Sequence, residues 1–249
     1  MTRSLAFLLC VLAGALAAQS FEDEFRRGLL ALSANDLAQA RQSLESASRL
    51  KPENALLWAA LAQTYLRAKE TTLADEAAGK ASRLATADSP AQHALAMYYS
   101  ETREFAKAAN AERHYASSQG ADPQAAARAA DLSLRAGEAE LAVLWAKNAL
   151  KRGDTAQMHH LLGQADAAAN RPDDAERELR VAAERDPMLE AYAFDLGQLQ
   201  LRRGDFAGAT ATLGKACKRF PDSAQMHLAY GVAAMGSAGS PMPSTHFCA

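Results

Sequence analysis

Polar side chains able to bind an extended ligand recur along the chain at one repeating place. Three glutamines and one aspartate stand there: Gln63, Asp131, Gln164 and Gln198. Amide and carboxylate groups in such a column can hydrogen-bond the backbone of an extended peptide. Ordinary solvated residues would give the same pattern, so peptide recognition and simple solvation are two open interpretations of this column.

Arginine fills a second column in alternate segments, at Arg67, Arg135 and Arg202. Guanidinium groups in a strip can bind carboxylates through paired hydrogen bonds. Glu101 holds the corresponding place in an intervening segment, and cations near the carboxyl end of a helix also stabilise its dipole. The sequence therefore favours solvated arginines near helix ends, with a carboxylate-binding strip as the alternative.

Histidine gives the best indication of metal or acid–base chemistry. His159 and His160 are adjacent, but adjacent helical residues point about 100° apart, and no Cys, Asp or Glu stands at a spacing that completes a metal site. We expect His159 to pack between helices and His160 to face a groove. A small-ligand or metal-dependent binder or enzyme using His93, Asp131 and His160 is the alternative function. Because no nucleophile, base and oxyanion donor converge in the sequence, we expect neither catalysis nor a cofactor.

The elements that must position these side chains are helices. Alanine is the commonest residue of the 249 and β-branched residues are few, a composition that favours helix. Hydrophobic residues make up 49% of the chain, too many for a disordered protein. The 27 basic and 29 acidic residues nearly balance, so the chain lacks the electrostatic footprint of a nucleic-acid binder.

A period of 34 residues organises the whole chain, with one unit a residue short. Two places in each unit hold only Gly or Ala, which indicates that helix backbones meet there. The eighth place holds Gly28, Ala62, Ala96, Ala130, Gly163, Gly197 and Gly231, and the twentieth holds Ala40, Ala74, Ala108, Ala142, Ala175 and Ala209.

Each unit is predicted to be a helix hairpin, because apolar residues recur at helical spacing in two blocks. Gly or Asn that can adopt a left-handed conformation separates the blocks, and proline closes several second helices. The turns are at Asn35-Asp36, Gly137, Asn170 and Gly204, and the prolines are Pro52, Pro187 and Pro221.

This pattern closely resembles the tetratricopeptide repeat family from Phe21 to about Met235. The first-helix half of the family signature is matched by Trp58, Leu61, Ala62 and Tyr65. The best complete unit comprises Leu196, Gly197, Gly204, Asp205, Phe206, Ala209, Leu213, Ala216 and Pro221. Glu112 and Tyr115 depart from the signature, as do Ala126 and Ala129, so packing in those two units should be less regular.

The resemblance implies an all-α solenoid, a right-handed superhelix whose first helices line a concave groove that binds peptides or folded partners. About six hairpins are expected at residues 21–54, 55–88, 89–122, 123–155, 156–189 and 190–223, with a closing helix at 224–235. Besides the glutamine and arginine columns, the groove should include His93, Met97, His160 and Phe194. The expected function is a non-enzymatic protein–protein interaction scaffold, and a structural protein that self-associates through its ends is a further alternative.

The first 18 residues read as a secretory signal peptide. Arg3 precedes an apolar run that is too short to span a bilayer, and Ala15-Leu16-Ala17 forms a cleavage pattern. We expect cleavage after Ala17 or Ala18 and a periplasmic or secreted mature chain without membrane insertion; an uncleaved anchor is the alternative. A bridge between Cys217 and Cys248 is left open. Residues 236–249 are rich in turn formers and are expected to be disordered.

Overall fold

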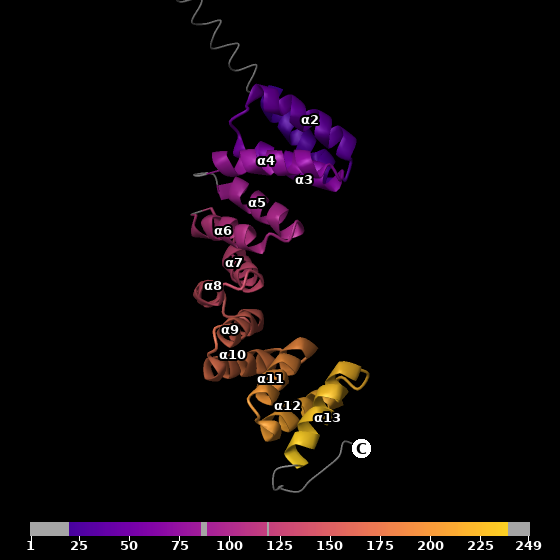
Figure 1. The fold of residues 1–249 in the computed structure, drawn as a ribbon, viewed down its shortest axis with the longest axis vertical. Coiled ribbons are helices and arrows are strands. Elements are labelled where there is room, and N and C mark those ends of the chain that lie inside the picture. The colour runs from indigo at the N-terminus through magenta and orange to yellow at the C-terminus, as the bar shows by residue number, and fades with distance from the viewer. Residues whose placement is uncertain (1–19, 86–88, 119, 239–249) are drawn as a thin grey trace, which may run out of the picture. The chain divides into compact units, whose positions relative to one another are not determined.

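The computed structural model describes residues 20–85, 89–118 and 120–238, and this part of the chain is built from helices joined by short turns, without strands. It confirms the predicted all-α helical repeat. The signal peptide, the tail from residue 239 and Cys248 lie outside the described residues. The chain divides into two compact units, at residues 1–121 and 122–249, and each is described by itself (Figure 1).

The first unit consists of helix pairs in succession. Residues 20–33 are helical, and α3 packs on α2, α4 and α5 while α5 packs on α6. The helices that follow residues 20–33 are α2 (Leu37–Leu50), α3 (Ala55–Arg67), α4 (Thr71–Leu84), α5 (Ser89–Glu101) and α6 (Phe105–Ser117).

The second unit continues the alternation of first and second helices. Each first helix packs on the second helix that follows it, and the first helices α7 and α9 also contact each other, as do α11 and α13. Its helices are α7 (Ala125–Arg135), α8 (Ala139–Arg152), α9 (Ala156–Ala168), α10 (Pro172–Arg185), α11 (Glu190–Arg202), α12 (Phe206–Arg219) and α13 (Ala224–Ala238).

Local sequence explains where many helices begin and end. Polar side chains cap several amino termini: the side chain of Asp36 accepts from the Gln39 amide, that of Asn54 from the Leu57 amide and that of Thr155 from the Met158 amide. Three second helices end two residues before the predicted prolines, at Leu50, Arg185 and Arg219. These breaks separate one hairpin from the next.

Left-handed residues mark the turn inside each hairpin. Positive φ angles occur at Asn35, Lys69, Arg103, Gly137, Asn170 and Gly204, which is the same place in six successive units, including the unit that is one residue short. The predicted turns at Asn35, Gly137, Asn170 and Gly204 are confirmed. Lys69 and Arg103 also adopt this conformation although their side chains disfavour it, because the neighbouring helices dictate the turn.

The small-residue columns lie where helices meet. All six alanines of the twentieth place are fully buried. In the eighth place, a Cβ added to Gly28, Gly163 or Gly197 would lie within 3.0 Å of a leucine side chain on the next helix. These leucines are Leu44, Leu179 and Leu213, each 16 residues after its glycine.

The last helix departs from expectation in two ways. Helix α13 continues to Ala238, beyond the predicted end at residue 235, so residues 236–238 are helical and do not begin a disordered tail. Gly231 holds the eighth place, but a Cβ there would meet nothing within 4 Å. The small residue is present at this place, whereas the leucine contact is not.

Candidate functional site

Side chains on α9 and α11 form a connected polar cluster in the second unit. The Nε2 atom of His160 lies 2.7 Å from Oδ2 of Asp195, and Nε2 of Gln164 donates to the same oxygen at 2.9 Å. The His160 ring also lies against the Tyr192 ring, with centroids 4.6 Å apart. We call His160, Gln164, Tyr192, Asp195 and Gln198 the α9–α11 site.

The distance between α9 and α11 leaves room for the side chains of this cluster. The backbones of α9 and α11 approach less closely than those of α7 and α9, and the bonds to Asp195 bridge the distance. The side chains of His160 and Asp195 are 15% and 30% exposed. Because the histidine is held on two sides, by Asp195 and by Tyr192, the cluster is ordered before any ligand arrives.

Asp195 carries a stabilised negative charge. Burial alone would raise its pKa, but hydrogen bonds from His160 and Gln164, together with the charges of His160 and Arg202, outweigh burial and lower the pKa below its ordinary value. Both hydrogen bonds reach Oδ2. The carboxylate therefore stays ionised at neutral pH.

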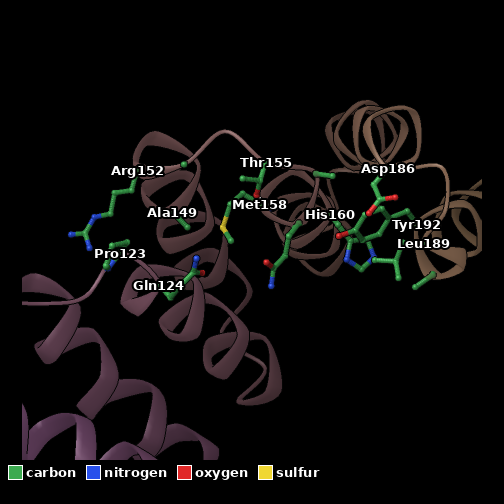
Figure 2. A pocket seen from close by; sticks show the side chains of 14 residues that line it. Pro123, Gln124, Ala149, Arg152, Thr155, Met158, His160, Asp186, Leu189 and Tyr192 are labelled. Carbon is green, nitrogen blue, oxygen red and sulfur yellow. Dashed lines mark hydrogen bonds between the residues drawn. The ribbon is translucent and has the colours of Figure 1, made fainter.

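A pocket of about 680 Å³ opens on one side of this cluster. Figure 2 shows His160, Tyr192 and Leu189 along one side of it and Pro123, Gln124 and Arg152 along the other. The lining is largely apolar, with Met158 among its residues, and its charged members are Arg152 and Asp186. Such a cavity suits an apolar side chain with a few polar contacts at its edge.

A second pocket, of about 710 Å³, lies on the other side of the cluster and is lined by Gln164, Asp195, Gln198, Arg202 and Arg203 among others. Arg203 is engaged by ion pairs to Asp173 and Glu176 on α10. Gln198 and Arg202 are exposed. Leu134, Leu179 and Leu199 line this second pocket as well. His160 lines the first pocket and Asp195 lines the second, so the hydrogen-bonded pair lies between them.

The structure brings together several residues predicted for the groove. His160, Gln164, Gln198 and Arg202 all line one of these two pockets. On α7, Asp131 and Arg135 are exposed and form a 3.9 Å ion pair with each other, so they stand outside the hydrogen-bonded cluster.

Phe194 was expected in the groove and is placed differently. Its ring is partly buried and packs against the hydrophobic cluster formed by α12 and α13, so it contributes to the core. A large aromatic residue next to two stacked helices gains more by burial than by exposure.

Gln63 requires a similar correction in the first unit. The side chain is buried, and its Nε2 donates to the Ala94 carbonyl oxygen on α5 at 3.1 Å. The amide links α3 to α5 and is not presented to a ligand. A buried amide satisfied by a backbone oxygen stabilises the packing.

His93 is also engaged by its own unit. Its Nδ1 lies 2.8 Å from Oε2 of Glu112, a side chain that is 1% exposed, and the ring stacks on Tyr115. The two departures from the repeat signature, Glu112 and Tyr115, are therefore the residues that hold His93. Met97 remains 44% exposed, and exposed Arg67 donates to the Leu32 carbonyl oxygen.

His159 packs between helices as predicted. The residue is buried, and its ring nitrogens lie 2.7 Å from Glu178 and 2.8 Å from Asp154. Across the described ranges, no group of three or more His, Cys, Asp or Glu side chains is arranged to hold a metal ion.

Sequence reasoning missed Tyr192 and Asp195. Asp195 lies 31 residues after Gln164, the same separation that joins Gln63 to Ala94. That repeating link between one unit's ninth place and the next unit's sixth place is the signal that would have found it.

Comparisons with known proteins agree with the repeat pattern. The family model for the tetratricopeptide repeat matches residues 25–91, 160–212 and 194–240, together more than half of the chain. A search of curated proteins found no significant match. No helix in the described part of the chain is both long and apolar enough to cross a membrane.

Solved structures share the fold at low sequence identity. PilW, a widely conserved type IV pilus biogenesis factor, is 17% identical with a TM-score of 0.59, over 84% of this chain and 98% of that chain. YrrB, a TPR protein with an unusual peptide-binding site, is 16% identical with a TM-score of 0.60, over 77% and 100%. PilF of Pseudomonas aeruginosa is 17% identical with a TM-score of 0.56, over 86% and 96%. These likenesses show the fold alone.

Proposed function

The chain belongs to the tetratricopeptide repeat family, and we propose that it is a non-enzymatic scaffold that binds a protein or peptide partner at the α9–α11 site. Proteins of this repeat fold generally act as interaction scaffolds, and the α9–α11 site offers hydrogen-bonding groups on an ordered helical surface.

The observation that carries this proposal is the bridge at Asp195. His160 and Gln164 both bind its Oδ2, which fixes the side chains that separate the first pocket from the second, where more charged and amide groups line the edge. An extended peptide running along these side chains places one apolar side chain beside Met158 and Leu189. Its backbone then meets the amides of Gln164 and Gln198. No bond-making chemistry is required of any of these groups.

The proposed setting is the cell envelope. The support is the amino-terminal sequence, with Arg3, the apolar run and the Ala15-Leu16-Ala17 pattern. PilW, which shares this fold, is a type IV pilus biogenesis factor, and it provides a precedent for this fold in such a role. A mature periplasmic or secreted chain is the result.

A selection followed by titration tests the scaffold proposal. The purified mature chain is used to select from a displayed random-peptide library, and an enriched synthetic peptide is titrated by calorimetry. Combined replacement of His160, Gln164 and Gln198 by Ala should weaken its binding at least about tenfold with unchanged helicity. The control is Lys215→Ala, because Lys215 is exposed on the second helix α12. Loss of binding in the control alone, or enrichment of no peptide, would contradict the proposal.

A further inference from the structure

Helix α13 has two opposite apolar faces, and one of them is uncovered. Met226, Ala229 and Ala233 are buried against α12. On the other side, Leu228 is 73% exposed and Met235 is 71% exposed. An exposed apolar helix face of this kind marks an interaction surface.

The uncovered face follows a regular spacing. Its members are separated by four, three, four and three residues, the spacing with which one helix packs along another. They are Ala224, Leu228, Gly231, Met235 and Ala238, and we call them the α13 stripe. Because the 15 residues of α13 include no Asp, Glu, Lys or Arg, no charge opposes the approach of an identical helix.

Gly231 leaves space on the α13 stripe for a side chain of a neighbouring helix. At the equivalent Gly28, Gly163 and Gly197, a leucine from the next helix fills the space above the glycine. Above Gly231 that space is open. A helix that brings a leucine to this point would repeat the contact seen three times elsewhere in the described chain.

The stripe itself carries the matching leucine. Large and small residues alternate along it, so an antiparallel copy can be placed with Leu228 of one chain over Gly231 of the other. In an antiparallel pair, each step forward along one helix is a step backward along the other. The same register therefore places Met235 of one copy over Ala224 of the other. Every large side chain then faces a small one, as close helix packing requires.

We propose that α13 is the surface through which two copies of this chain associate, antiparallel, in the register Leu228 over Gly231. The inference is independent of the α9–α11 site and goes beyond the scaffold function. The exposed parts of Leu228 and Met235, together with that of Val232 beside the α13 stripe, amount to on the order of 350 Å² per copy, against about 800 Å² per partner in a standard interface. The association is therefore weak and forms at high micromolar to millimolar concentration.

The test is sedimentation equilibrium of the full mature chain under reducing conditions, from micromolar to millimolar concentration. The average mass should rise from one chain toward two. Gly231→Leu should abolish the rise while keeping the helical content of the monomer and leaving its melting temperature no lower than that of the wild type, because a side chain there meets nothing in its own chain and glycine is a poor helix former. A wild-type chain that stays monomeric throughout, or a Gly231→Leu variant that associates like the wild type, would overturn the proposal.

A compensating pair of substitutions tests the register. Leu228→Ala combined with Gly231→Leu exchanges large for small, so the double variant should recover much of the association that Gly231→Leu loses. Failure of this recovery would reject the proposed pairing. Removal of residues 239–249 should leave the association unchanged. If the chain associates only after this removal, the proposal is wrong, because residues 239–249 would then be what covers the α13 stripe in the full chain.

Discussion

Replacing Gly197 tests the helix contact on which the repeat depends. A Cβ at this position would lie 2.5 Å from Cδ2 of Leu213, 2.6 Å from its Cγ and 3.0 Å from its Cδ1. Leu213 is fully buried, so its side chain has no solvent to move into. Any side chain at residue 197 therefore forces α11 and α12 apart.

The expected magnitude is the balance of two effects. Replacing Gly by Ala inside a helix stabilises by about 0.5–1 kcal/mol when space is free, whereas overpacking costs about 1–3 kcal/mol. Gly197→Ala should therefore lower the free energy of unfolding by up to about 2.5 kcal/mol, and Gly197→Leu by about 1–3 kcal/mol or more. Gly231→Ala is the matched control at the same place of the repeat, and it should raise the free energy by about 0.5–1 kcal/mol.

Urea denaturation followed by far-ultraviolet circular dichroism measures these differences. Truncation of the contacting residue supplies a second control. The Gly197→Ala/Leu213→Ala double variant should lose less free energy of unfolding than the sum of the losses of the two single variants, because Leu213→Ala removes the atoms that clash. Equal stability of Gly197→Ala and Gly231→Ala would refute the argument that Leu213 fills the space above Gly197.

Three further outcomes are expected. Asp195→Asn should cost about 1 kcal/mol at neutral pH; because the native pKa of Asp195 is lowered, this difference is present above the unfolded-state pKa and should vanish in acid melts as pH falls through the native pKa. Asp166→Asn should instead stabilise the protein by about 1 kcal/mol at neutral pH, since burial raises the pKa of Asp166 and its Oδ1 accepts no hydrogen bond. The stability of the wild type, but not of the variant, should fall as the pH rises past the unfolded-state pKa of this carboxyl group. Parallel pH profiles of the two proteins would argue against this prediction. Amino-terminal sequencing of the mature protein should begin at Ala18 or Gln19, and an intact Met1 in the soluble fraction would contradict export.

The architecture was predictable because its main determinants are local and repeat. Gly and Ala at fixed places, and Asn or Gly at turns, leave a periodic trace in the sequence. The left-handed Lys69 and Arg103 leave no such trace, since the surrounding helices impose their conformation. The three extra helical residues of α13 are likewise a matter of packing, because Gly236 approaches the Phe206 ring closely.

The site was predictable only in part, since a polar residue at a groove position has two possible partners. Gln164 and His160 reach the wall of the pockets, whereas Gln63 at the equivalent place is turned into the contact between α3 and α5. Periodicity fixes the column but not the partner. Glu178 shows the same limit: it lies on the second helix α10, yet its side chain accepts a hydrogen bond from His159 on α9, a partner that its place in the repeat does not predict.

Backbone amide chemical shifts of the mature chain, recorded while the enriched synthetic peptide is added, test the central proposal most directly. The largest changes should fall on the α9–α11 site, at His160, Gln164, Asp195 and Gln198, with little change on α12. Changes concentrated on α12, or on the α13 stripe, would contradict binding between α9 and α11.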